Sequence, residues 1–478
     1  MKKLACVCLA ALLAAGIAGC APKAEGAYAF DEVLADSFAG LGVEWDAYEH
    51  PDVVSEDKWQ LVLERVDKLS PAYIRCMINL DWVVTDWQKN TDDGGADDTW
   101  SYNWEQSNIK SLLKILDHCQ ERGIGVALGA WRAVDGWDMR DSSDARYAKI
   151  VGDVFDELVN KRGYSCIRWL VPTNEPNYIE GNTFGSWSAG VNNVYAQLQE
   201  HGLAEKVAIT GPDVSSYTAA MTWCADAARD VGDKLGNYSV HLYVSDYTVD
   251  SGNLAENISD IDGAIAEYDD ALAQKGLYIW EGGLIDGRNE QFDTNELIDT
   301  YGYGFRMADY TVQCILGGAE GVCFWELDDA MHFLENGQTK NWGMFSSLGD
   351  AAQQELRPWF QSSMLLTKIF APGRRVYGCP VNGEKETTVR AAAAVSEDGT
   401  EGGYCVLNQG TQERECTFYL PAVSGGEKLY VYIYGEGHTK LGADGYILPN
   451  YELDGSLSSA LTLRVPAKST VFVTNVKY

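Results

Sequence analysis

The run Ile167-Arg-Trp-Leu-Val-Pro-Thr-Asn-Glu-Pro176 contains the strongest indication of the fold. An apolar stretch with the composition of a buried strand ends there on a polar Asn-Glu-Pro triplet. A second run, Leu277-Tyr-Ile-Trp-Glu-Gly-Gly283, has the same form and brings one carboxyl, Glu281, to a glycine-rich turn. Because all strands of a parallel barrel end at one rim, the two runs predict that Glu175 and Glu281 meet there.

Short β-rich runs alternate with longer helical runs between Gly40 and Asp328. The predicted strands are 40–45, 73–80, 125–131, 167–175, 206–212, 238–244, 277–281 and 321–326. Between them, apolar residues recur at the 3,4 spacing of an amphipathic helix. Eight such units predict an α/β fold, a (β/α)8 TIM barrel. An open doubly wound sheet is disfavoured, because no glycine-rich nucleotide turn follows the first strand.

The helical period fades after residue 360, and short alternating runs take over. These runs are 387–395, 403–408, 415–420, 428–434, 460–465 and 470–476, separated by Gly, Asp, Asn and Pro clusters. They predict a C-terminal all-β sandwich domain over 361–478, after a catalytic barrel over 37–360. Packing against the barrel is the expected role of the sandwich, because no exposed aromatic row that would bind carbohydrate is evident.

The N-terminus has the pattern of a processed segment. Lys2 and Lys3 precede an apolar stretch that is too short to span a bilayer, and small residues follow. Ile17-Ala18-Gly19-Cys20 resembles the bacterial lipobox. The resemblance implies a lipoprotein signal peptide over 1–20, lipidation of Cys20, a tether over 21–36, and an extracellular, membrane-anchored location at a bacterial cell surface. A plain secretory signal is the alternative.

Charge and cysteine content restrict the partners. Seventy acidic and thirty-seven basic residues give a net charge of −33, which repels nucleic acid and anionic lipid headgroups and favours a neutral partner. Excluding Cys6, Cys8 and Cys20 leaves nine of twelve cysteines, so at least one thiol stays unpaired. Because no CxxC or Cys/His spacing suggests zinc, we expect no metal and no cofactor.

Two carboxyls at strand ends indicate glycoside hydrolysis. A retaining glycosidase needs two carboxyls ~5 to 5.5 Å apart, one protonated to donate to the leaving oxygen and one ionised to attack the anomeric carbon. The chain resembles the glycoside hydrolase superfamily called clan A, or the 4/7 superfamily, over most of residues 40–328. Its cellulases, mannanases, β-glucosidases and β-xylosidases place these groups on strands four and seven. The resemblance implies that Glu175 is the acid/base and Glu281 the nucleophile.

Further residues match the pattern of that superfamily. The resemblance implies that Arg75, in Tyr-Ile-Arg-Cys, supports the nucleophile and that Asn174 bonds the 2-hydroxyl of the reacting sugar. His241 and Tyr243 match its His-x-Tyr pair, whose tyrosine lies near the nucleophile, and alternation places both side chains on one face of a strand. Trp325, in Cys-Phe-Trp-Glu, matches the platform under the reacting ring.

Aromatic and acidic residues near other strand ends are candidates for sugar binding. Trp45 and Asp46 at the end of the first strand, and Trp131 on the third, are expected to line the site of the non-reducing sugar. Strand three ends at Trp131-Arg132 and lacks the histidine often found there, which leaves the family within the superfamily open. The tryptophans of the loop after strand two either bind sugar or pack the loop, and the sequence favours neither; they are residues 82, 87, 100 and 104.

The sequence therefore predicts a surface-anchored retaining glycoside hydrolase that acts on a β-linked glycan by double displacement. In this role Glu175 is expected to titrate above an ordinary glutamate. A transglycosidase that uses the same carboxyls and a non-catalytic carbohydrate-binding lipoprotein remain alternatives. Sugar identity, linkage, endo or exo action and oligomeric state are not predicted.

Overall fold

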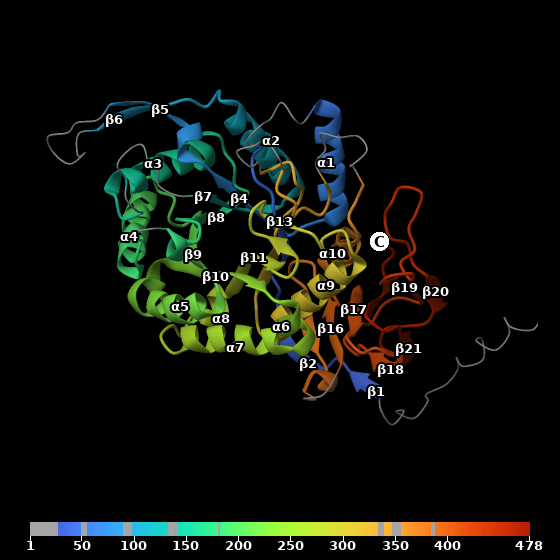
Figure 1. Ribbon diagram of the computed structural model, residues 1–478. Helices are drawn as coiled ribbons and strands as arrows, with labels where there is room; N and C mark the ends of the chain where they lie inside the picture. Colours follow the sequence, from blue (N-terminus) through green and yellow to red (C-terminus); the bar gives the residue numbers. More distant parts are fainter. Residues whose placement is uncertain are drawn as a thin grey trace, which may run out of the picture.

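The computed structural model describes residues 27–48, 55–88, 98–131, 139, 142–179, 182–332, 339–346, 355–383 and 388–478. The predicted signal peptide and Cys20 lie outside these residues. Two bodies lie side by side, a larger helix-covered barrel and a smaller β-domain drawn in orange and red (Figure 1). Among the described residues, no helix has both the length and the apolar character that crossing a bilayer requires.

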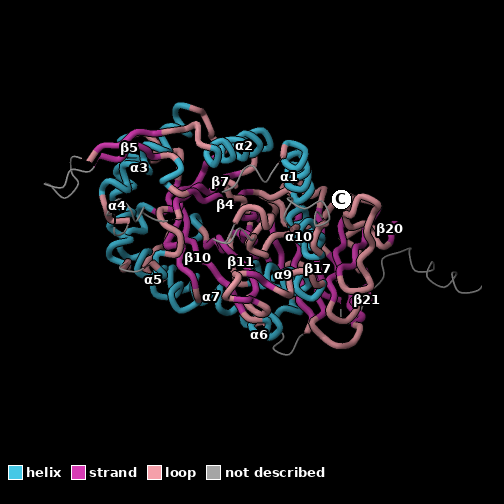
Figure 2. Tube along the Cα trace, turned by 45° about the horizontal axis from the view of Figure 1, so that its top comes forward, coloured by secondary structure: helices cyan, strands magenta, loops and turns pink. Residues whose placement is uncertain are grey.

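The larger body is a closed barrel of eight parallel strands in the order β10-β11-β14-β3-β4-β7-β8-β9. The strands are β3 (Gly40–Glu44), β4 (Tyr73–Ile78), β7 (Gly125–Ala130), β8 (Ile167–Val171), β9 (Ala208–Ser215), β10 (Leu235–Val244), β11 (Leu277–Leu284) and β14 (Gly321–Phe324). Each overlaps one predicted strand, so the predicted barrel is confirmed. Figure 2 shows these strands at the centre with helices around them.

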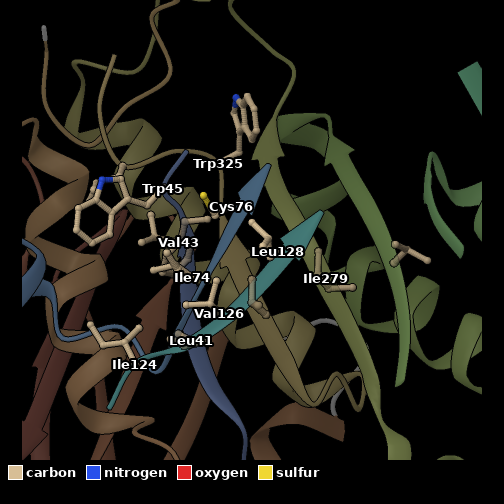
Figure 3. Packing of buried hydrophobic residues seen from close by; sticks show 14 of the residues in the cluster. Leu41, Val43, Trp45, Ile74, Cys76, Ile124, Val126, Leu128, Ile279 and Trp325 are labelled. Atoms are coloured by element: carbon tan, nitrogen blue, oxygen red, sulfur yellow. The ribbon is translucent and has the colours of Figure 1, made fainter. Parts of the chain in front are cut away.

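The helices follow the barrel strands along the chain. They are α1 (Glu56–Leu69), α2 (Ser107–Arg122), α3 (Ala145–Phe155), α4 (Phe184–Glu200), α5 (Tyr217–Val231), α6 (Asp246–Ser251), α7 (Asn253–Ala266), α8 (Leu272–Lys275), α9 (Tyr301–Leu316) and α10 (Pro358–Ile369). Trp59, Val62, Val66 and Leu69 of α1 are buried, as an apolar stripe at the 3,4 spacing predicts. Helix α2 ends at Gly123, whose φ of 70° favours glycine. Outward strand residues such as Ile74 and Val126 pack under the helices (Figure 3).

Inward-facing side chains fill the barrel. Tyr73, Met77, Tyr278 and Trp280 belong to one buried cluster inside it, and the rings of Tyr278 and Trp280 stack with centroids 5.2 Å apart. A barrel interior of this kind is a packed core rather than a pore. The polar groups are therefore concentrated at the carboxyl ends of the strands, where the loops begin.

The smaller body is a sandwich of two sheets, as predicted. Its sheets have the orders β2-β15-β16-β17-β22-β19-β20 and β1-β18-β21. The strands are β1 (Ala27–Ala29), β2 (Glu32–Ala35), β15 (Arg375–Gly378), β16 (Val389–Val395), β17 (Gly402–Asn408), β18 (Arg414–Tyr419), β19 (Lys428–Tyr434), β20 (Tyr451–Asp454), β21 (Leu461–Val465) and β22 (Ser469–Thr474).

Two predicted domain boundaries need correction. β1 and β2 lie within the segment predicted as a tether, yet β1 pairs with β18 and β2 with β15, so the blue strands lie among orange ones in Figure 1. Phe30, between them, is fully buried against Tyr404 and Phe418. The boundary at 360/361 falls inside α10, which packs against α1 and α9 as the last barrel helix. The barrel therefore extends to Ile369.

The loop after β4 forms a hairpin of β5 (Val84–Gln88) and β6 (Thr99–Tyr102). Trp87 and Trp100 stack there at 5.3 Å, and the Trp100 indole donates to the hydroxyl of Tyr102. That hydroxyl in turn donates to Asp153 on α3 at 2.7 Å. These contacts favour packing over sugar binding for the tryptophans of this loop.

The nine described cysteines are all unpaired, and eight of them are buried; Cys416 is partly exposed. Buried thiols in strands, such as Cys76 and Cys323, act as small apolar side chains. This agrees with the expectation that at least one thiol stays unpaired.

Candidate active site

Glu175 reaches the barrel rim through a short, constrained segment after β8. Its backbone has φ 40° and ψ 55°, a left-handed conformation that costs a residue other than glycine about 1–3 kcal/mol. A 3-10 turn, Pro176–Tyr178, follows, and the Tyr178 amide donates to the carbonyl of Glu175 at 2.9 Å. Asn177 fixes this turn to β9, because its side chain donates to the carbonyl of Ser215 at 3.0 Å and accepts from the Ser215 amide at 3.1 Å.

Glu281 faces the same rim because of a β-bulge in β11. Along the pairing with β10, Val240 lies opposite Ile279 but His241 lies opposite Glu281, so Trp280 is an extra residue. A bulge of this kind changes which face the following side chains point to. As a result both Trp280 and Glu281 point inward, and the Trp280 indole donates to the Thr210 hydroxyl at 2.7 Å.

The two carboxyls meet at one cavity. One oxygen of Glu175, one oxygen of Glu281 and a ring nitrogen of His241 all lie within 4.8 Å of one another. This is close to the separation of ~5 to 5.5 Å that retaining glycosidases use. Both glutamates line a cavity of about 730 Å³, together with Asn174, Tyr243 and several aromatic side chains. Glu281 is buried, with 4% of its surface exposed, whereas Glu175 is half-buried.

Arg75, on β4, is fully buried under this pair and neutralises several carboxylates. Its Nη1 donates to Glu281 Oε1 at 2.8 Å and to Glu44 Oε1 at 2.9 Å. Its Nη2 donates to Asp213 Oδ2 at 2.9 Å and to Asn174 Oδ1. Burial alone lowers the pKa of Arg75, but the Glu44 and Asp213 carboxylates outweigh it and raise that pKa well above its usual value. Arg75 is therefore a permanent cation that holds Glu281 in place.

His241, on β10, lies between both glutamates and a third carboxylate. Its Nδ1 is 3.0 Å from Glu175 Oε1 and 3.4 Å from Glu281 Oε1, and its Nε2 is 3.1 Å from Asp213 Oδ1. Burial opposes a charge on the ring, but the Asp213 and Glu281 carboxylates outweigh it and raise the pKa of His241 to about 10. The ring is therefore an imidazolium at neutral pH, with a proton on both nitrogens.

Glu175, His241 and Glu281 are also, among the residues that the structure describes, the one group of three side chains that offers potential metal ligands at close range. An imidazolium has no free lone pair, so His241 would have to lose the Nδ1 proton before binding a metal. The arrangement as it stands fits proton transfer between carboxyls better than it fits a metal site.

The pKa values of the two glutamates differ from the expectation. Burial raises the pKa of Glu281 to about 7, although His241 and Arg75 oppose the shift. Burial also raises the pKa of Glu175, but the hydrogen bond and charge of His241, together with Ser215 and Arg75, outweigh it and bring the pKa below the ordinary value. The expectation that Glu175 titrates above an ordinary glutamate is therefore wrong for the free site. The reason is His241, which lies closer to Glu175 than to Glu281.

Tyr243 completes the surroundings of Glu281. Its hydroxyl donates to Glu281 Oε2 at 2.6 Å, and burial raises the pKa of that hydroxyl well above its usual value. Because Arg75 donates to Oε1, each oxygen of the carboxylate has its own donor. The indole of Trp342 packs against the Tyr243 ring with centroids 6.0 Å apart. Glu281 is thereby held in one orientation.

Aromatic rings form one wall of the cavity. Trp325, which stands beyond the strand ends in Figure 3, stacks on the ring of His332 at 5.3 Å, and Trp131 packs edge-on against both rings. His332 Nε2 lies 3.0 Å from Asp46 Oδ2 and 3.3 Å from Glu326 Oε2. Trp131, Trp325 and His332 all line the cavity.

Two predicted sugar-binding residues do not line the cavity. Trp45 is fully buried and stacks on Trp59 of α1 at 5.7 Å, on the helix side of the strands (Figure 3). It follows Glu44, which contacts Arg75 inside the barrel, and successive side chains of a strand point to opposite faces. Asp46 is buried, and its Oδ2 lies 3.0 Å from Nε2 of His332, which itself lines the cavity.

Several residues of the site were not predicted from the sequence. Asp213 contacts both Arg75 and His241, but it follows a predicted strand end and has a φ of 58° that no pattern indicated. Burial raises the pKa of Asp213, but His241 and Arg75 outweigh it and bring the pKa to about 2. His332 and Trp342 come from the long loop after β14, which has no periodicity. The other cavity residues that were missed are Asn79, Tyr178, Ile179, Ser215, Ser216, Ile285, Arg288, Asp293 and Lys340.

Comparison with known proteins gives a clear result for structure and none for sequence. No family model and no curated protein sequence matches the chain. A family 30 subfamily 8 glycoside hydrolase, the xylanase Xyn30A from Clostridium acetobutylicum, has a TM-score of 0.61 at 12% identity and covers 94% of this chain and 99% of its own. SrfJ from Salmonella typhimurium has a TM-score of 0.64 at 14% identity and covers 96% of this chain and 94% of its own.

A family 39 β-xylosidase from Caulobacter crescentus has a TM-score of 0.61 at 15% identity and covers 94% of this chain and 99% of its own. At sequence identities this low, similarity to these structures is evidence for the fold alone. Because both bodies are covered, the likeness includes the sandwich as well as the barrel. The chain therefore has the fold of these family 30 and family 39 glycoside hydrolases over nearly its whole described length.

Proposed function

We propose that the protein is a retaining glycoside hydrolase that cleaves β-linked sugars by double displacement. The observation that carries the proposal is the approach of Glu175 and Glu281 to within 4.8 Å, at a cavity lined by tryptophans. A purely binding protein has no use for two acids at this distance above a buried cation. The fold shared with family 30 and family 39 glycoside hydrolases supports the same conclusion.

In the first step Glu281 attacks the anomeric carbon while Glu175 gives its proton to the departing oxygen. Arg75 and Tyr243 keep the attacking carboxylate oriented and hold its charge before the reaction. In the second step Glu175, now ionised, takes a proton from water, and the water oxygen replaces Glu281 on the sugar. Once Glu281 carries the sugar it is neutral, so the repulsion on the Glu175 carboxylate decreases.

The substrate class follows from the cavity and from the neighbours. Its aromatic wall of Trp131 and Trp325 offers flat apolar faces that suit the C–H face of a neutral pyranose. The similar structures include enzymes named as xylanases and as a β-xylosidase. We therefore propose a β-linked glycan as the substrate and regard xylans and xylo-oligosaccharides as the first to test.

The proposal is tested by following hydrolysis of β-xylosides, β-glucosides and their polymers with proton NMR. Retention of the β-anomer in the first-formed sugar is the expected result, with no release by the Glu281→Ala variant. Inversion of the anomer would contradict the double displacement. Capture of the sugar by an added sugar in preference to water would instead identify a transglycosidase that uses the same carboxyls.

The pattern Ile17-Ala18-Gly19-Cys20 is the basis for a proposal about location. We propose that Cys20 is lipidated and holds the enzyme at the outside of a bacterial membrane. Metabolic labelling with a fatty-acid analogue should mark the wild-type protein and not a Cys20→Ala variant. Equal labelling of the two proteins would contradict lipidation at Cys20. Absence of label from the wild-type protein would favour a plain secretory signal.

A further inference from the structure

The barrel order places the two walls of the cavity on opposite sides. In a closed ring of eight strands, the fourth neighbour of a strand is the one across the barrel, and β8 and β14 stand in this relation. Glu175 follows β8, whereas Trp325 and His332 follow β14. The cavity therefore has an acid on one side and the stacked aromatic wall on the other.

This arrangement assigns a side to each half of a substrate. An acid catalyst must come within hydrogen-bond reach of the oxygen to which it gives its proton. In the proposed reaction that oxygen belongs to the leaving sugar, so the leaving sugar lies on the side of Glu175. The sugar that is transferred to Glu281 then faces the wall of Trp325, across the barrel from Glu175.

Tyr178 is the aromatic residue on the Glu175 side. It lines the cavity with 65% of its surface exposed, and it packs against no other ring in the described residues. Its position is fixed relative to Glu175, because its amide donates to the Glu175 carbonyl and because Asn177 is hydrogen-bonded twice to Ser215. The backbone that carries the ring is therefore held beside the proton donor.

We infer that Tyr178 is the platform for the leaving sugar, and that the natural leaving group is a pyranose rather than a small alcohol. The inference rests on the proposed function. A sugar that stacks on Tyr178 covers an otherwise exposed ring and is pre-positioned to receive the proton from Glu175. The protein would then act on disaccharides, oligosaccharides or chains, in which a sugar occupies each side of the scissile bond.

The test compares two substrates that share one glycone. A β-linked disaccharide has a sugar leaving group, whereas the matching β-glycosyl fluoride releases fluoride and has no ring to stack. For Tyr178→Ala, kcat/KM on the disaccharide should fall about tenfold, the effect of losing ~1.4 kcal/mol of stacking, while kcat/KM on the fluoride stays unchanged. Tyr178→Phe, which keeps the ring, should behave as wild type on both substrates.

Tyr247 provides the matched control. It is 74% exposed, more than Tyr178, and it does not line the cavity. Tyr247→Ala should therefore leave kcat/KM on both substrates unchanged.

Equal losses of kcat/KM on disaccharide and fluoride for Tyr178→Ala, or no loss on the disaccharide, would overturn the role of Tyr178 while the glycosidase function stands. A wild-type protein that releases fluoride but cleaves no disaccharide would overturn it too, and one inactive on every glycoside would end both proposals.

Discussion

The imidazolium of His241 donates from Nδ1 to Oε1 of Glu175 at 3.0 Å, so the proposed proton donor is bonded to a positive charge in the free site. That bond favours the ionised form of Glu175, whereas burial favours the protonated form of Glu281. Because the two carboxyls are close, they titrate as a coupled pair. Between the two pKa values the pair holds one proton, and the reaction uses the form in which this proton is on Glu175.

The first prediction concerns the pH dependence of kcat/KM. Above the pKa of about 7 for Glu281 the pair loses its single proton, so no acid remains for the leaving oxygen. Below the lowered pKa of Glu175 both carboxyls are protonated, so no ionised nucleophile remains. A bell-shaped profile with its maximum in mildly acidic solution is expected, measured on a soluble disaccharide. A maximum above pH 8 would contradict this assignment.

Replacing His241 by glutamine should move that profile. The substitution removes the positive charge that lowers the pKa of both glutamates, so both limbs of the bell should shift to higher pH. The measurement is the pH profile of kcat/KM for His241→Gln beside wild type. If the variant has a lower kcat/KM but both limbs of its pH profile stay at the wild-type pH, the His241 ring contributes packing and not charge.

Glu281→Gln tests the nucleophile with little change in shape. Glutamine can still accept from Arg75 through its oxygen, and its NH2 group can donate to the Tyr243 hydroxyl, but it cannot form a stable glycosyl ester. The value of kcat should therefore fall on the order of 10⁴-fold or more. Binding of an oligosaccharide, followed by calorimetry, should persist. Glu320→Gln is a suitable control, because the pKa of this partly buried glutamate is also raised to about 7 by burial but it does not line the cavity. Retention of near wild-type turnover by Glu281→Gln would exclude the assignment.

Glu175→Ala tests the acid/base role by chemical rescue. Without its acid the enzyme should still form the glycosyl intermediate from an activated aryl glycoside, whose leaving group needs no proton. Azide can then attack in place of the water that Glu175 would activate, so added azide should restore turnover and give a β-glycosyl azide. The product is identified by mass spectrometry and NMR. If azide rescues no activated substrate, Glu175 is not the acid/base.

The sequence could predict the strands because each has a local signal. An apolar run followed by a helical stripe is recognisable without tertiary contacts. The spacing of two residues between His241 and Tyr243 correctly places both side chains on one strand face, beside the carboxyls. Glu281 was identified from its position at a strand end. Simple alternation from Tyr278 would have pointed it away from the cavity, since the bulge at Trp280 has no signature in the sequence.

Other features depend on contacts between distant segments. β1 and β2 are strands only because β18 and β15 offer edges to pair with, and three or four residues alone carry no periodicity. Asp213 becomes a site residue through a local left-handed turn that aims it at Arg75. Such features are set by tertiary pairing, which local patterns do not record.

The last prediction concerns the contact between the two bodies. Asp309, on α9 of the barrel, is fully buried, and its carboxylate accepts from Arg390 on β16 and from Gln409 after β17. Burial raises the pKa of Asp309, although Arg390 opposes the shift. Arg390→Ala leaves a buried carboxylate without its cation and should lower the free energy of unfolding by about 3–5 kcal/mol at pH 8.

The loss should be smaller at pH 5. A carboxyl whose folded pKa is raised costs stability only above its unfolded pKa, so partial protonation of Asp309 relieves the penalty as the pH falls. Urea unfolding at the two pH values measures both effects. Arg464→Ala is the control, because Arg464 is exposed and pairs with Glu415 only at 3.7 Å, so its removal should cost less than about 1 kcal/mol. If Arg390→Ala is no less stable than Arg464→Ala at pH 8, the buried pair does not hold the sandwich against the barrel.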